Sequence, residues 1–165
     1  MISSLDPIQQ IGVICRDILF EFPETRGQCV GVSALLSQRL SSVECENYVA
    51  LGSLKCRGKL AFKYSRPISS EPGVAQWDGH AWVITANDTL IDLSLLRTAG
   101  ALPKHSNLRR YLDEEGLLGK GVALMHKQAT HHLAYSEKER LGHALFAPII
   151  AGLYVKNGLQ PPHSS

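Results

Sequence analysis

The stretch Pro23-Glu24-Thr25-Arg26-Gly27-Gln28-Cys29-Val30-Gly31-Val32-Ser33-Ala34-Leu35-Leu36 places a cysteine where a helix is predicted to begin. Thr25 followed three residues later by Gln28 fits the capping-box pattern that opens many helices. Apolar residues then recur at helical spacing, at Val32, Leu35, Leu36 and Leu40. We therefore predict a helix from near Thr25 to Ser41 or Ser42, with Cys29 in or next to its first turn.

A cysteine at the start of a helix is a candidate nucleophile. The first N–H groups of a helix lack intrahelical acceptors and carry the positive end of its dipole, so they favour a thiolate there. The alternative is that Cys29 fills space in the core, which is the commoner role of a free cysteine. A catalytic thiol also needs a base to take its proton and a group that orients the base. These partners have to come from elsewhere in the chain.

The composition is that of an ordinary globular protein. Of the 165 residues 44% are hydrophobic and 19% charged, so we predict one domain spanning residues 1–165. A net charge of +2 without a basic stripe argues against a nucleic-acid partner, and no apolar run is long enough to span a bilayer. The first six residues lack the basic and apolar regions of a secretory signal. We therefore expect a cytoplasmic protein without a membrane partner, and its oligomeric state is left open.

Neither the cysteines nor the histidines have the spacing of a metal site. The four cysteines form no CxxC pair and no dense disulfide framework: Cys15, Cys29, Cys45 and Cys56. Four of the seven histidines form a cluster within the last third of the chain, without a recognised ligand spacing: His126, His131, His132 and His143. We predict reduced thiols, no metal and no cofactor.

Helical and strand patterns segregate along the chain. A helix is predicted from Asp6, as N-cap before Pro7, to Phe22, and Pro23 ends it. Strands are predicted over residues 48–56 and 60–64, joined by a turn at Arg57-Gly58, and again over 80–84 and 89–95 around an Asn87-Asp88 turn signal. An exposed loop is predicted over residues 65–76. The fold class is therefore α+β, with N-terminal helices packed on an antiparallel sheet.

The last third gives weaker patterns. Residues 108–118 favour a helix, and residues 121–125 and 132–135 favour two short strands. Ser136-Glu137-Lys138-Glu139 is a second capping box, which predicts a helix running toward Tyr154.

His80 and Asp92 lie on the two consecutive strands predicted over 80–84 and 89–95. In an antiparallel hairpin, the numbers of any two directly opposite residues add up to the same sum. Because side chains alternate faces along a strand, His80 and Asp92 lie on the same face only if this sum is even. A two-residue loop at Asn87-Asp88 gives an odd sum, whereas a three-residue loop over 85–87 or 86–88, or a bulge, brings the two residues together. His80 as an ordinary sheet histidine and Asp92 as an edge or turn residue are the alternatives. Asp92 interrupts an apolar run, Leu90-Ile91-Asp92-Leu93, where an unpaired carboxylate would be costly.

Three segments together resemble a known family. Gly27-Gln28-Cys29 on a helix, then Gly79-His80-Ala81-Trp82-Val83, then Ile91-Asp92-Leu93 are similar to the transglutaminase-like branch of the papain-like superfamily. The segment His80–Val83 with an aspartate twelve residues later looks most like the lasso-peptide leader proteases, and the layout is also similar to bacterial glutamine deamidases and arylamine acetyltransferases. The resemblance covers residues 27–94, under half of the chain. It implies a catalytic triad of Cys29, His80 and Asp92, in this chain order.

The chain also departs from the papain pattern. Papain-type enzymes carry an oxyanion-hole glutamine six residues before the cysteine, and Pro23 stands there in this chain. The Cys29 backbone N–H at the helix start is the safer oxyanion donor. Gln28, Trp77 and Trp82 are further oxyanion or substrate-binding candidates.

The resulting hypothesis is a cysteine-nucleophile hydrolase that acts on an amide or thioester carbonyl, as a thiol protease, amidase or glutamine deamidase. Its expected substrate is a protein or peptide. Hydrolysis is favoured over transfer because no motif for a second substrate is recognisable. The alternatives are an acyltransferase or transglutaminase on the same triad, and a non-catalytic interaction module with an idle triad.

Overall fold

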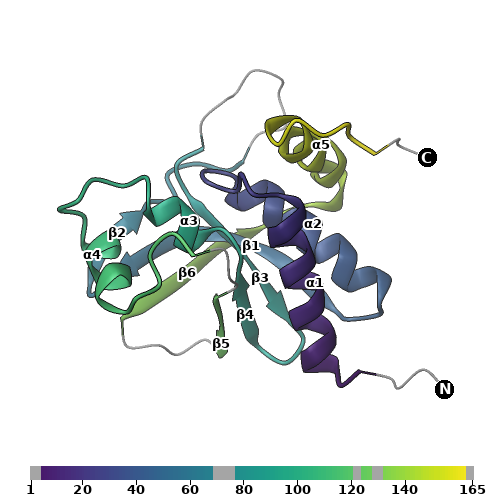
Figure 1. Ribbon diagram of the computed structural model, residues 1–165, viewed down its shortest axis with the longest axis horizontal. Helices are drawn as coiled ribbons and strands as arrows, with labels where there is room; N and C mark the ends of the chain where they lie inside the picture. Colours follow the sequence, from purple (N-terminus) through teal and green to yellow (C-terminus); the bar gives the residue numbers. More distant parts are fainter. Residues whose placement is uncertain (1–4, 69–76, 121–123, 128–131, 163–165) are drawn as a thin grey trace.

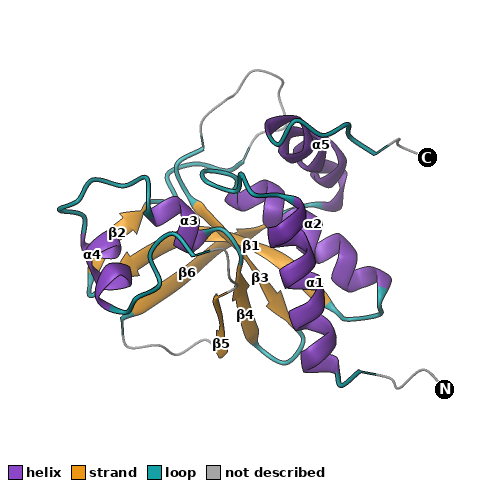
Figure 2. Cartoon of the chain, in the orientation of Figure 1, coloured by secondary structure: helices purple, strands orange, loops and turns teal. Residues whose placement is uncertain are grey.

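The computed structural model describes residues 5–68, 77–120, 124–127 and 132–162 (Figure 1). It is an α+β structure with two N-terminal helices and an antiparallel sheet (Figure 2). Its elements in chain order are α1 (Pro7–Glu21), α2 (Cys29–Ser42), β1 (Asn47–Cys56), β2 (Lys59–Phe62), β3 (His80–Thr85), β4 (Thr89–Asp92), α3 (Leu95–Ala99), α4 (Asn107–Glu114), β5 (Leu124–Lys127), β6 (Leu133–Arg140), the 3-10 helix η1 (His143–Leu145) and α5 (Phe146–Lys156). Among the described helices, none has both the length and the apolar character that crossing a membrane requires.

Strand β1 is the centre of the sheet. Residues 50–52 pair with both β3 and β6, so these two strands lie on opposite edges of β1. β2 pairs with the C-terminal end of β1, on the same edge as β3, and β4 and β5 continue the sheet beyond β3. Gly52 lies opposite His80 and Leu54 opposite Phe62, so the end of β2 meets the start of β3. This junction is where the candidate site lies.

Helices pack on the sheet in two groups. Helices α1, α2 and α5 bury the odd-numbered side chains of β1 and β3 in the main core, whereas α3 and α4 pack over the far end of β1 and β6. Figure 1 shows the two groups at opposite ends of the molecule. A smaller apolar cluster on the second face holds Ala50, Trp82, Ile84 and Leu90 beside Tyr135. The faces follow the alternation of each strand, as expected for side chains that point to opposite sides at successive residues.

Several local predictions are confirmed. Asp6 is the N-cap of α1 with Pro7 as its first residue, and α2 ends at Ser42. The β1–β2 hairpin turns at Arg57 and Gly58, whose φ angles of 50° and 80° are the two positive values of a type I′ turn. Of the loop predicted over 65–76, residues 69–76 lie outside the described part, as do 121–123 of the strand predicted over 121–125.

Both capping-box predictions are wrong. Helix α2 begins at Cys29 with Gln28 as N-cap, and no side chain caps it. Ser136–Glu139 lies in strand β6, where it pairs with residues 51–53 of β1. Strand pairing along β1 outweighs the local helical preference of this segment, and the helix that reaches Tyr154 begins only at Phe146.

Two other element ends differ from the prediction. The strand predicted over 89–95 stops at Asp92, because the Asp92 carboxylate accepts the N–H groups of Ser94 and Leu95 and so starts α3. The helix predicted over 108–118 runs from Asn107 to Glu114. Gly116, just after the C-cap Glu115, has a φ of 71°, the left-handed conformation that often follows a helix C-terminus.

Candidate active site

The centre of the site is a buried pair of His80 and Asp92. His80 Nε2 lies 2.6 Å from Asp92 Oδ2, and the two side chains are 1% and 0% exposed. The pairing Val83↔Ile91 and Ile84↔Leu90 gives the even sum on which this contact depends.

The hairpin between the two residues has the odd loop that the contact requires. Residues 86–88 connect β3 and β4, the Asp88 N–H donates to the Thr85 carbonyl at 3.0 Å, and Asp88 has a φ of 58°. A tight turn that ends in a left-handed residue is typical of three-residue hairpin loops. Of the loops considered from the sequence, the three-residue loop over 86–88 is therefore the one present, and it brings His80 and Asp92 into contact.

Asp92 accepts hydrogen bonds on both of its oxygens. Oδ2 accepts from His80 and from the Tyr135 hydroxyl at 2.8 Å. Oδ1 accepts the backbone N–H groups of Ser94 at 3.2 Å and Leu95 at 3.0 Å. Burial opposes the charged carboxylate, but the charge of His80 and these hydrogen bonds together hold the pKa of Asp92 below its usual range. Asp92 is therefore a fixed anion behind the imidazole.

Cys29 lies on the other side of His80. It is the first residue of α2 and half-buried, and its thiol lies close enough to the His80 side chain to contribute to the raised pKa of the imidazole. Burial alone would lower the pKa of His80, but the charge and hydrogen bond of Asp92, with a smaller contribution from Cys29, raise it to about 10. Since Nε2 is bound to Asp92, Nδ1 is the ring nitrogen that can exchange a proton with the thiol.

Aromatic rings fix the plane of the imidazole. Phe62, at the end of β2, stacks on His80 with ring centroids 4.9 Å apart and planes 13° apart. Trp82 and Tyr135 each lie 6.1 Å from the imidazole centroid. Trp82 is only 2% exposed and supports His80 from within the sheet. Its predicted role in binding substrate stays a prediction.

The other two predicted candidates lie around the same residues. Gln28 is half-buried, and its Oε1 atom lies 3.6 Å from where a Cβ on Gly31 would be, so its side chain follows the first turn of α2. The indole N–H of Trp77 donates to the Arg66 carbonyl at 2.9 Å, and the ring covers Gly79, the residue before His80. The roles of Gln28 and Trp77 in binding substrate stay predictions.

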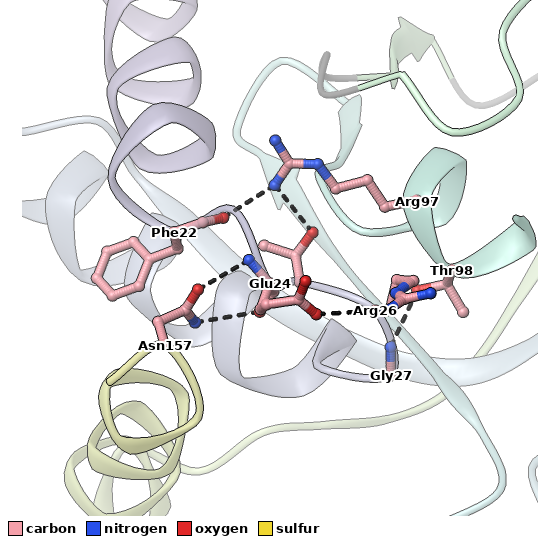
Figure 3. Close-up of polar contacts among 8 residues, drawn as sticks. Phe22, Glu24, Arg26, Gly27, Arg97, Thr98 and Asn157 are labelled. Atoms are coloured by element: carbon pink, nitrogen blue, oxygen red, sulfur yellow. Dashed lines mark hydrogen bonds and ion pairs between the residues drawn. The ribbon is translucent and has the colours of Figure 1, made fainter. Parts of the chain in front are cut away.

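The segment that leads into Cys29 is held by α3 and α5 (Figure 3). Arg97 of α3 donates to the carbonyls of Phe22 at 2.9 Å and Leu19 at 3.1 Å, and to the Thr25 hydroxyl at 3.3 Å. This contact explains why Thr25 does not cap α2: its side chain is fully buried against Arg97.

Two further contacts complete this support. The Thr98 hydroxyl accepts the Gly27 N–H at 3.2 Å, and the Asn157 carboxamide bonds both the N–H and the carbonyl of Glu24 at 2.8 and 3.1 Å (Figure 3). Helix α3 therefore contacts both halves of the site: its start binds Asp92, and its side chains hold the approach to Cys29.

Sequence reasoning missed Tyr135, Phe62 and Arg97. Tyr135 and Phe62 come from strands far from Cys29 and Asp92 in the chain, and no spacing relates them to His80. Arg97 lies in a helix that was not predicted, of which only the first residue, Leu95, falls in the strand predicted over 89–95. The β-prone character of Tyr135 and its neighbours was recognised, but nothing in the sequence directs the hydroxyl to Asp92.

The remaining cysteines are unlike Cys29 in their surroundings. Burial raises the pKa of Cys15 to about 12 and also raises the pKa of Cys45 and Cys56. All four thiols are free. Within the described residues, no three histidine, cysteine, aspartate or glutamate side chains are grouped so that they could hold a metal ion. His131 lies outside the described part.

Comparison with protein-family models, with curated proteins and with solved structures found no match for this chain. What can be inferred about its function therefore comes from its own residues and their contacts. A thiol at a helix start, next to an imidazole that a buried carboxylate orients, has the components of nucleophilic acyl transfer.

The buried pair should make the stability of the protein depend on pH in two ranges. The pKa of His80 is raised from 6.5 to about 10, so its contribution is complete below pH 6.5 and is lost as the pH rises toward 10. The pKa of Asp92 is lowered from 3.8, so its contribution is present above that pH and is lost as the pH falls through the lower, folded-state value.

We therefore predict that the free energy of unfolding falls above pH 6.5, with a slope of at most about 1.4 kcal/mol per pH unit for one proton. Urea denaturation at a series of pH values measures it. In the Asp92→Asn variant the charge that holds the proton on His80 is gone, so this part of the slope should disappear. Equal slopes in the two proteins would show that the pair is not linked to folding in this way.

Proposed function

We propose that this protein is a cysteine-nucleophile enzyme with the triad Cys29, His80 and Asp92, of the transglutaminase-like branch of the papain-like superfamily. The observation that carries the proposal is the surroundings of one imidazole, which makes a 2.6 Å bond to the buried Asp92 and has the Cys29 thiol, at the start of α2, close enough to contribute to its raised pKa. The order Cys–His–Asp along the chain and the cysteine at the start of a helix beside an antiparallel sheet support the family assignment.

In the proposed reaction, Cys29 acts as a thiolate paired with the His80 imidazolium, which its raised pKa keeps protonated at neutral pH, and the Cys29 sulfur attacks the carbonyl carbon of an amide or thioester. The negative oxygen that forms is stabilised by the Cys29 backbone N–H, one of the N–H groups that a helix start leaves without an intrahelical acceptor. His80 returns the proton to the leaving amine or thiol, and an acyl thioester remains on Cys29. Water, deprotonated by His80, then attacks the thioester and frees the thiol.

Asp92 acts through His80 and does not touch the substrate. Its bond to Nε2 keeps the proton on that nitrogen, so that Nδ1 faces the thiol in the correct tautomer, and its charge stabilises the imidazolium. Tyr135 is a positioning residue in turn, since its hydroxyl donates to the Asp92 oxygen that His80 also contacts.

Hydrolysis of a protein or peptide substrate, as by a thiol protease, amidase or glutamine deamidase, is the favoured form of the reaction, without a cofactor. Four free cysteines suit a cytoplasmic location. Transfer of the acyl group to an amine uses the same triad and differs only in what attacks the thioester.

An activated ester tests the nucleophile without knowledge of the natural substrate. With p-nitrophenyl acetate, Cys29 should displace p-nitrophenolate in a rapid burst and become acetylated, which mass spectrometry of the digested protein locates. Cys29→Ala should abolish the burst, and Asp92→Asn should slow it by roughly 10²- to 10⁴-fold because the imidazole loses its tautomer. Adding an amine such as hydroxylamine separates transfer from hydrolysis by the product formed.

The matched control for Asp92→Asn is Leu93→Ala. Leu93 is the neighbouring residue and packs into the main core at 2% exposure. Its truncation should destabilise the protein by about 2–5 kcal/mol while the burst rate of folded protein stays near wild type. A burst that survives in Cys29→Ala, or acetylation spread evenly over all four cysteines, would contradict the enzyme and favour a non-catalytic interaction module.

Tyr135→Phe tests the positioning role through the pH profile. The Tyr135 hydrogen bond helps to lower the pKa of Asp92, so its removal makes the carboxylate easier to protonate. The decrease of the burst rate at low pH (the acid limb of its pH profile) should therefore begin at a higher pH. The burst rate at neutral pH should fall by roughly tenfold, the effect of losing one hydrogen bond to a charged group. Tyr48→Phe, on the same small apolar cluster, is the control that should leave the limb in place. An unchanged acid limb in Tyr135→Phe would reduce Tyr135 to a packing residue.

A further inference from the structure

A groove of about 380 Å³ lies between β2 and the segment that connects α3 to α4. Lys59, Leu60 and Ala61 of β2 all line it. The side chains of successive strand residues point to opposite faces of the sheet. Because three consecutive residues line this groove, it runs along the edge of the strand and not over one face. In the described part of the chain β2 pairs only with β1, and its other edge therefore presents backbone N–H and C=O groups toward the groove.

The lining of the groove is basic and apolar. Lys59, His105 and Arg110 contribute exposed cationic or protonatable side chains, and no carboxylate is among the lining residues. Leu60 is 53% exposed beside them, which is unusual for a leucine on a strand and leaves an apolar surface without cover in the described structure. These features complement a chain that carries carboxylates and apolar side chains.

Strand β2 connects the groove with the candidate site. Phe62, the last residue of the strand, stacks on His80. Lys59 is three residues earlier, or about 10 Å at the rise of an extended strand. A peptide laid along the open edge of β2 would therefore place its next residues near the imidazole.

We propose that this groove binds an extended acidic segment of the peptide or protein substrate as an additional strand on β2. Backbone hydrogen bonds to the open edge hold the segment, carboxylates on it face Lys59 and Arg110, and its apolar side chains cover Leu60. This assignment rests on the proposed function, since it treats the bound segment as the part of the substrate next to the carbonyl that Cys29 attacks.

Binding is measured separately from chemistry, in the full-length Cys29→Ala variant. The probe is a fluorescein-labelled peptide of alternating glutamate and valine, compared with the same peptide carrying glutamine in place of glutamate. We expect the acidic peptide to bind more tightly than the neutral one and to weaken as salt is added, since exposed charge pairs are screened. Backbone amide shifts in NMR spectra should change at residues 59–61, 102 and 104–106.

Charge reversal of the groove gives the second arm. Adding Lys59→Glu and Arg110→Glu should weaken binding of the acidic peptide by about tenfold, from two exposed charge pairs. Arg16→Glu with Lys156→Glu is the matched control, because these exposed cations lie on α1 and α5, outside the groove. Circular dichroism establishes that each variant is folded. Leu60→Asp, which changes the apolar surface instead, should also weaken binding of the acidic peptide.

Three results would overturn the proposal: no binding of the acidic peptide, equal weakening by the groove and control variants, or shift changes that map away from β2. A neutral peptide that binds as well as the acidic one would also overturn the charge preference. If the acidic peptide binds in the groove but the wild-type protein forms no acyl intermediate, the groove proposal holds and the proposed enzymatic function is contradicted. The two proposals therefore fail separately.

Discussion

The structure around the site depends on one buried carboxylate. A charged group without solvent is strongly destabilising unless it is paired and hydrogen-bonded. Asp92 is fully buried and meets this requirement with donors from three parts of the chain: His80 at the start of β3, Tyr135 on β6, and the first backbone N–H groups of the turn into α3. The same bonds orient the imidazole. Stability and the proposed catalysis therefore draw on one network, and a change at Asp92 affects both.

The network extends from Asp92 to the nucleophile through α3. This helix has five residues and starts with N–H groups on Asp92, and its Arg97 and Thr98 side chains hold the segment before Cys29. The carboxylate and the thiol lie 63 positions apart in the chain (92 − 29), yet one short helix contacts both regions. We infer that α3 sets the distance between the base and the nucleophile. Side-chain hydrogen bonds of this kind fix a geometry that packing alone would leave variable.

Sequence reasoning identified the part of the site that follows from the alternation of side chains along strands. The side-chain alternation of two short strands showed which loop lengths would bring His80 and Asp92 together, and the apolar run that Asp92 interrupts indicated that its carboxylate needs a partner. The position of Cys29 in the first turn was also predicted, although the capping box used as evidence does not form. What could not be predicted are Tyr135, Phe62 and Arg97, because their positions follow from how β6 and β2 pair with β1 and from a helix that Asp92 itself starts.

Both capping boxes failed for the same physical reason. A capping box is worth about 1 kcal/mol, and a tertiary contact of similar or greater strength can displace it. The Thr25 hydroxyl accepts a hydrogen bond from Arg97, and Ser136–Glu139 forms part of strand β6, which pairs with β1. By contrast, alternation along a strand has no competitor of equal strength once one face is buried, so the condition that it set, an odd loop if His80 and Asp92 are to meet, agrees with the structure.

The most direct test of the central claim is the rate at which each cysteine is alkylated by iodoacetamide at about pH 6, where an ordinary thiol is almost fully protonated. Mass spectrometry of the four cysteine-containing peptides resolves the rates in a single sample. The account predicts that Cys29 is modified well before Cys15, Cys45 and Cys56, and that His80→Gln removes this advantage. A Cys29 rate that matches that of Cys45, or that does not change when His80 is replaced, would contradict it.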